Sequence, residues 1–100
     1  MRNHDDAVID MLRDDPGFAA EYLRVAFEEM DEVGGESAFL AALRHVVEAR
    51  GGMGAIADRS GLSRESLYRA ISPDGNPTLK TLTAVIHATG LRFADISHAA

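Results

Sequence analysis

The sequence predicts an all-α fold, a compact bundle of about five to six short helices. Three observations support this prediction. Apolar residues recur at the spacing of amphipathic helices, capping residues precede several of these runs, and no stretch alternates apolar and polar residues as a half-buried strand does. A chain of 100 residues is long enough to bury one hydrophobic core, so we expect one domain.

A first helix is expected over residues 16–33. Asp15 and Pro16 form a helix-start pair, an N-cap followed by a first-turn proline, and Gly34 and Gly35 should end the helix. Its apolar side chains cover a wider stripe than one core contact requires, so we expect part of this face to contact a second protein chain. The candidate contact residues are Phe18, Tyr22, Leu23, Phe27 and Met30.

A second helix is expected over residues 36–50, as the scaffold of the core. Its outward face carries Arg44 and Glu48, which are placed to form an ion pair one helical turn apart. Gly51 and Gly52 should end it. The apolar residues at core-facing spacing are Phe39, Leu40, Leu43, Val46 and Val47.

Residues 53–71 are expected to form two short helices that cross steeply, the shape of a helix-turn-helix. Ala57 is small enough for a close crossing, Gly61 can adopt a positive φ, and Ser63 can cap the next helix. The apolar residues that should hold the pair together are Ile56, Leu62, Leu67 and Ile71. An ordinary helix-glycine-helix junction without a DNA function is the alternative interpretation.

The second of these helices leaves a polar row facing outward, on an element that fits the major groove of DNA. Arg64 begins this helix, and arginine can bind O6 and N7 of guanine together, so Arg64 is the first candidate for base recognition. Residues at helix starts and in the following loop would contact phosphates. For the arginines, a solvated ion pair with Glu65 is the alternative. The candidate DNA-binding residues are Gly52, Met53, Ser63, Arg64, Glu65, Ser66, Tyr68, Arg69, Asn76, Thr78 and Lys80.

A turn-rich loop follows over residues 72–78, and Thr78 should cap a further helix over residues 79–89. Gly90 should end this helix. The apolar residues expected to face the core from this part of the chain are Leu79, Leu82, Val85, Ile86, Leu91 and Phe93.

The charge of the chain is divided between two segments. The whole sequence has a net charge of −6, which alone disfavours DNA binding. Residues 1–36 hold three arginines and eleven acidic residues, a charge of −8, whereas residues 37–100 hold seven basic and five acidic residues, a charge of +2. We therefore expect an acidic helical segment for protein contacts over residues 1–35 and a DNA-binding domain over residues 36–100.

Composition and spacing argue against several other functions. The sequence has no cysteine, which excludes disulfides and thiolate chemistry and fits a reducing cytoplasm. No apolar run approaches the roughly 18 residues of a membrane span, so we expect a soluble cytoplasmic protein. Residues 52–57 match part of the glycine pattern of dinucleotide-binding loops, but no predicted strand precedes them, so we expect no dinucleotide site there. We expect no enzyme activity, metal or cofactor, because no nucleophile neighbours a base and the histidines are scattered: His4, His45, His87 and His98.

The run Ser-Arg-Glu-Ser-Leu-Tyr-Arg-Ala followed by Asp-Gly-Asn-Pro, within residues 50–79, resembles the HigA-like addiction-module antidote proteins. These are antitoxins with a phage-repressor-type (Xre/Cro-like, lambda-repressor-like) helix-turn-helix, and the similarity covers residues 16–93. The resemblance implies a homodimeric repressor of its own operon that also binds and silences a basic toxin of the RelE/ParE type. Such a dimer would bind a palindromic double-stranded operator with half-sites about 34 Å apart.

The resemblance gives the acidic segment a partner, since apolar anchors and an acidic rim could cover a basic toxin. For the dimer, the expected surface combines the helix after Asp15 with residues 91–96. Three alternatives remain open. In the first, the acidic residues serve only solubility. In the second, the chain is a stand-alone phage-type repressor without a toxin, and in the third it is a helical protein-interaction module that does not bind DNA.

Overall fold

The computed structural model describes residues 3–97, which form seven α-helices and no strand. The helices are α1 (His4–Asp14), α2 (Pro16–Glu28), α3 (Gly35–Ala49), α4 (Gly52–Ser60), α5 (Arg64–Ala70), α6 (Leu79–Ala88) and α7 (Phe93–Ser97). The all-α prediction is confirmed for this part of the chain. The expected count of five to six helices was too low, because α1 and α7, at the two ends of the chain, were not predicted.

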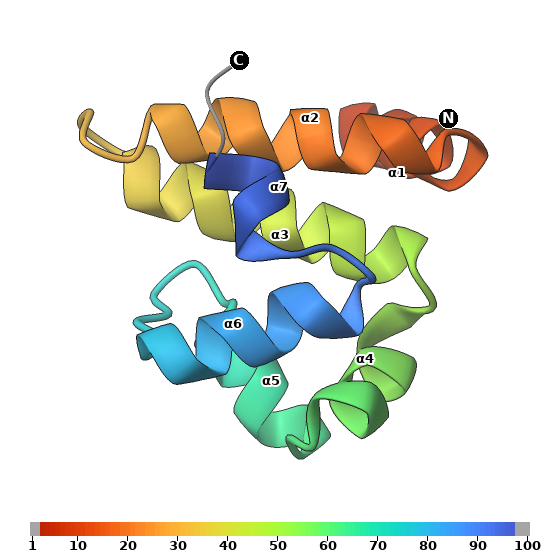
Figure 1. Ribbon diagram of the computed structural model, residues 1–100, viewed down its shortest axis with the longest axis vertical. Helices are drawn as coiled ribbons and strands as arrows, with labels where there is room; N and C mark the ends of the chain where they lie inside the picture. Colours follow the sequence, from red (N-terminus) through yellow and green to blue (C-terminus); the bar gives the residue numbers. More distant parts are fainter. Residues whose placement is uncertain (1–2, 98–100) are drawn as a thin grey trace.

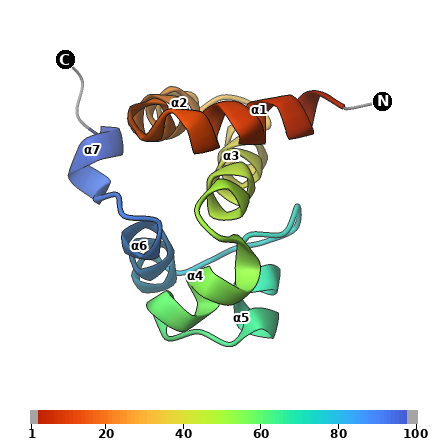
Figure 2. The ribbon, with the colours of Figure 1, turned by 90° about the vertical axis from the view of Figure 1, so that its right-hand side faces the viewer.

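The helices are arranged in tiers along the long axis of the molecule. Figure 1 shows α1 and α2 at the top, α3 beneath them, and α4, α5 and α6 at the bottom. The turned view in Figure 2 shows the same order. The short α7 packs against both α2 and α6. The acidic first segment therefore lies at the end of the molecule opposite to α5.

One hydrophobic core extends through these tiers. The two segments that differ in charge share this core, and their separate binding roles stay predictions. No helix among residues 3–97 combines the length and apolar composition needed to cross a bilayer. The largest side chains that are essentially inaccessible to solvent come from every helix of the fold: Leu12, Leu23, Phe39, Leu43, Val46, Val47, Ile56, Leu67, Ile71, Val85, Ile86 and Ile96.

The start of α2 agrees with the sequence, but its end does not. The Asp15 side chain accepts a hydrogen bond from the N–H of Gly17 at 3.1 Å, and Pro16 is the first residue of the helix. The expectation that this helix reaches residue 33 was wrong, because residues 29–34 form turns. A Cβ at Gly35 would overlap the carbonyl oxygen of Glu29, so only glycine permits this close return of the chain.

The wide apolar stripe of α2 is used mainly within the chain, because α2 packs against α1, α3 and α7. Leu23 is 0% exposed, so its expected contact with another chain is wrong in this arrangement. Phe27 packs edge-on against Phe39 of α3 and Phe93 of α7, with ring centroids 6.0 and 6.4 Å apart. Within residues 91–96, Leu91 and Ile96 are buried and Phe93 packs on the core, so the expected dimer surface, which stays a prediction, would have to use the exposed side chains of this segment.

The core face of α3 matches the prediction, and all five of its apolar residues named above are buried. The expected ion pair between Arg44 and Glu48 is wrong. The Arg44 Nη1 instead donates a hydrogen bond to the carbonyl oxygen of Ile71 at 2.6 Å. Ile71 follows the last residue of α5, where carbonyl groups lack helical partners, so Arg44 satisfies the end of α5 and fixes it against α3.

Helix α6 begins as predicted, since the Thr78 side chain accepts a hydrogen bond from the N–H of Thr81 at 3.1 Å. Gly90 has a φ of +91° just beyond the helix. Leu79 is 73% exposed, so the expectation that it faces the core was wrong. It is the first residue of α6 and precedes the turn that packs inward, whereas Val85 and Ile86 are buried as predicted.

A polar contact joins α1, α2 and α3 at the acidic end. The Tyr22 hydroxyl lies 2.7 Å from Nδ1 of His45, and Nε2 of His45 lies 3.4 Å from the Asp5 carboxylate. Burial and, second, the charge of Asp5 raise the pKa of Tyr22 above its ordinary value. The protonated hydroxyl is thus the form that the folded state favours.

We predict that Tyr22→Phe lowers the free energy of unfolding by about 1 kcal/mol, because the substitution removes the hydroxyl from His45. Urea denaturation near neutral pH measures this loss. The control is Tyr68→Phe, since Tyr68 is 70% exposed and should change stability little. Because the folded pKa of Tyr22 lies above the ordinary 10.0, its contribution is complete below pH 10 and is lost as the pH rises through the folded pKa. Equal losses in both variants would contradict the prediction.

Candidate nucleic-acid interface

The junction between α4 and α5 is built by the residues that the sequence indicated. Gly61 has a φ of +77°, and the next N–H, that of Leu62, donates to the carbonyl oxygen of Ala57 at 3.1 Å. Ser63 then accepts a hydrogen bond from the N–H of Ser66 on its Oγ at 3.0 Å, which caps α5. A left-handed glycine followed by an N-cap serine thus ends one helix and starts the next.

The inner faces of α4 and α5 hold the pair against the rest of the core. Ile56 and Leu67 are 0% exposed, Ala57 is 2% exposed and Ile71 is 1% exposed, while Leu62 is only half-buried. These contacts determine which side of α5 faces outward. The side chains on the outward side are Arg64, Glu65, Ser66, Tyr68 and Arg69, all exposed as predicted.

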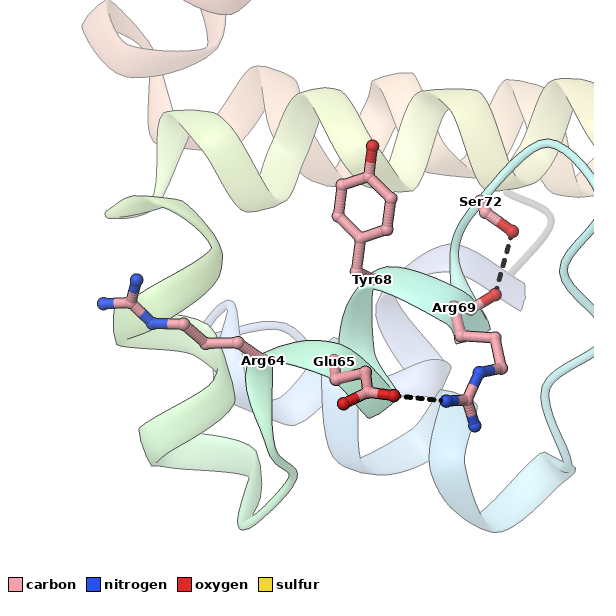
Figure 3. Close-up of a pocket in the computed structure, with 5 residues that line it drawn as sticks. All are labelled: Arg64, Glu65, Tyr68, Arg69 and Ser72. Atoms are coloured by element: carbon pink, nitrogen blue, oxygen red, sulfur yellow. Dashed lines mark hydrogen bonds and ion pairs between the residues drawn. The ribbon is translucent and has the colours of Figure 1, made fainter.

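The two arginines of α5 have different surroundings. Arg69 Nη2 lies 2.9 Å from the Glu65 carboxylate, and both side chains are largely exposed, so this ion pair contributes little. Arg64 makes no hydrogen bond or ion pair among the described residues and extends away from Arg69 (Figure 3). It lies across α4, because a Cβ at Gly54 would be 2.5 Å from Arg64 Nη2. The ion-pair interpretation therefore holds for Arg69 and not for Arg64.

Shallow hollows on both sides of α5 bring most of the candidate residues together. Arg64, Glu65, Tyr68 and Arg69 line one hollow (Figure 3). A groove between α5, the following loop and the start of α6 is lined by a second set that includes Ser66, Arg69, Asn76 and Thr78. Met53 lines a third hollow, together with Tyr68 and residues of α3.

The remaining candidates lie near these hollows without lining them. Gly52 begins α4 with a φ of +88°, Ser63 is occupied as the α5 cap, and Lys80 is exposed in the first turn of α6. Lys80, like Arg64, makes no hydrogen bond or ion pair within residues 3–97, so both cations are available to an anion. Gly54 also belongs to this surface, but its contact with Arg64 could not be predicted, because it depends on how α4 and α5 cross.

Two further arginines, Arg59 and Arg50, donate hydrogen bonds to backbone carbonyls. Arg59 Nη1 lies 3.2 Å from the carbonyl oxygens of Arg50 and of Ala88, so it joins the ends of α3 and α6. Arg50 Nη2 donates to the carbonyl oxygen of Pro16 at 3.4 Å. These cations support the scaffold. Within residues 3–97 no three His, Asp or Glu side chains gather as metal ligands, and His98 lies outside the described residues.

Comparisons with known proteins indicate a family of antidote proteins. A family described as probable addiction module antidote proteins matches residues 4–97. An uncharacterized protein of Haemophilus influenzae is 46% identical over 54 residues, a match that covers 54% of this chain and 55% of that relative, so the chain spans about half the length of the relative. No solved structure matches. Since the family match covers nearly the whole chain, the protein belongs to the family of probable addiction module antidote proteins.

Proposed function

We propose that this chain is the antitoxin of a type II toxin–antitoxin module, a cytoplasmic protein that represses its own operon and neutralises a basic RelE/ParE-type toxin by direct contact. The observation that carries the proposal is the family match over residues 4–97. The arrangement of charge supports it, because the outward row of α5 and the acidic segment lie at opposite ends of the molecule (Figure 1). DNA and a toxin could thus be bound at the same time.

For DNA binding, α5 acts as the recognition helix of a helix-turn-helix. Arg64 contacts a base edge, and no ion pair has to be broken to free its guanidinium, whereas Arg69 must first leave Glu65. The phosphate contacts come from the helix starts and the loop beside α5. Among them Lys80 supplies a cation, and Gly52, Met53, Asn76 and Thr78 supply backbone or polar groups.

Repression of an operon needs two such units on one operator. A homodimer would place two copies of α5 in successive turns of the major groove of a palindromic site, about 34 Å apart. The dimer would then make twice as many base and phosphate contacts as one subunit. This pairing supplies the affinity that one short helix lacks.

We predict that Arg64→Ala weakens binding to the DNA upstream of this chain's gene by about 1 to 3 kcal/mol and relaxes the preference at one base position. A mobility-shift titration with a set of single-base variants of that DNA measures both effects. Arg92→Ala is the matched control, because Arg92 is an exposed arginine paired with Asp95 far from α5 along the chain. Unchanged affinity for Arg64→Ala would remove Arg64 from the interface.

Lys80→Ala should behave differently, because a phosphate contact carries no sequence information. We expect weaker binding to every DNA variant by a similar factor, and a slope of log affinity against log salt that is smaller in magnitude by about one. The measurement is the same titration repeated at several salt concentrations. A change of base preference would contradict the phosphate assignment of Lys80.

Co-expression tests the antitoxin role itself. We predict that the full chain restores growth of cells that express the small basic protein encoded beside its gene, and that the two proteins co-purify. Their complex should dissociate more readily as the salt concentration rises, because an acidic surface and a basic surface attract each other through screened charges. Operator binding without rescue would indicate a stand-alone repressor, and loss of both activities would indicate a helical interaction module.

A further inference from the structure

A shallow groove lies on the surface between α2 and α3, where packing of the core leaves a space open to solvent. Its volume is about 280 Å³, just below the range of roughly 300–1,000 Å³ that is typical of small-molecule pockets. A groove of this size suits one or two side chains of a protein partner. It is lined by Phe18, Glu21, Tyr22, Val25 and Ala26 of α2, by its C-cap Glu29, and by Ala38 and Ala42 of α3.

The groove has an apolar centre with acidic flanks. Val25 is 45% exposed, although an apolar β-branched side chain gains nothing from solvent. Glu21 lies four residues before Val25 on α2, and Glu29, the C-cap of α2, lies four residues after it. From α3 the groove receives two alanines, Ala38 and Ala42, whose small side chains leave room above them. An apolar anchor with a charged rim is the arrangement found in protein–protein contact sites.

One of the acidic flanks, Glu29, is placed where the helix itself disfavours a negative charge. Glu28 is the last residue of α2 and Glu29 its C-cap, and the last turn contains no basic residue. The C-terminal end of a helix favours cations, and Glu28 is balanced there by Arg24, so the Glu29 carboxylate is the one that the stability of α2 does not explain. A cationic partner would remove this unfavourable interaction.

The negative charge of the groove is only partly balanced within the chain. Arg24 pairs with Glu21, and Arg24 Nη1 lies 2.8 Å from Glu28. The hydrogen bond from Arg24 lowers the pKa of Glu21, so this carboxylate is ionised at neutral pH. Glu29 has no ion pair among the described residues. One carboxylate beside Val25 is therefore free to bind a cation.

We propose that this groove is the docking site for the basic toxin, an inference that rests on the proposed function. An apolar side chain of the toxin packs over Val25, and neighbouring lysines or arginines bind Glu29 and Glu21. A second copy of this chain fits less well, because a two-fold contact through the groove would place the glutamates of one subunit against those of the other. Charge complementarity thus favours a basic partner over self-association.

The test uses the full chain and the basic protein encoded beside its gene, with affinity measured by calorimetry. Val25→Arg should lower the affinity at least about tenfold, because it fills the groove and repels a basic partner. Fold stability should be preserved, since the new guanidinium lies one turn from both Glu21 and Glu29. Met11→Arg is the matched control, because Met11 is an apolar residue on α1 that is 53% exposed and does not line the groove. It should change the affinity by less than about twofold.

Glu29→Gln supplies a second variant that keeps the shape of the groove. It should weaken binding, and the loss should shrink as the salt concentration rises. Wild-type affinity for Val25→Arg, or an equal loss in Met11→Arg, would overturn the groove while leaving the antitoxin role intact. Dissociation of a self-associated chain by Val25→Arg, seen in light scattering, would overturn it in favour of a dimer contact. No binding by the unchanged chain would overturn the proposed function itself.

Discussion

The burial of α3 is the constraint on which the rest of the structure depends. This helix packs against α1, α2 and α4, and its apolar face is inaccessible to solvent. Its outer side also has a structural role, because Arg44 donates a hydrogen bond to the carbonyl oxygen of Ile71, the C-cap of α5. Helix α3 therefore sets the position of both ends of the molecule. The energy that holds α5 in place comes from apolar burial, with one charge-assisted hydrogen bond in addition.

The single core explains how one small chain can offer two unlike surfaces. Acidic residues are concentrated at the end formed by α1 and α2, whereas Arg64 of α5 and Lys80 of α6 are the lysine or arginine side chains without a partner among residues 3–97. Separation across the molecule keeps the acidic residues away from a phosphate backbone. The net charge of −6 therefore describes neither surface, and only its distribution over the fold bears on binding.

The local features of the candidate interface could be predicted well from the sequence. Gly61 ends α4 with a positive φ, Ser63 and Thr78 cap the next helices, and the polar row of α5 is exposed. Each of these depends on a few consecutive residues and on steric or hydrogen-bonding preferences that do not require the rest of the fold. The local pair of Arg69 with Glu65 could be weighed from the sequence, but the contacts of Arg44 and Arg64 depend on how the helices pack. Arg44 binds the end of α5, and Arg64 lies over Gly54.

The apolar stripe of α2 shows most clearly which features could be predicted from the sequence and which depended on the tertiary structure. Its periodicity was enough to identify an amphipathic helix and its capped start. Periodicity could not tell whether a wide apolar face meets another protein or several helices of its own chain, since both require the same side chains. Packing against α1, α3 and α7 buried Leu23 and left Val25 beside an open groove. A few consecutive residues thus determine which segments are helical and where each helix ends. Contacts between segments far apart in the chain decide which side chains stay exposed and able to bind a partner.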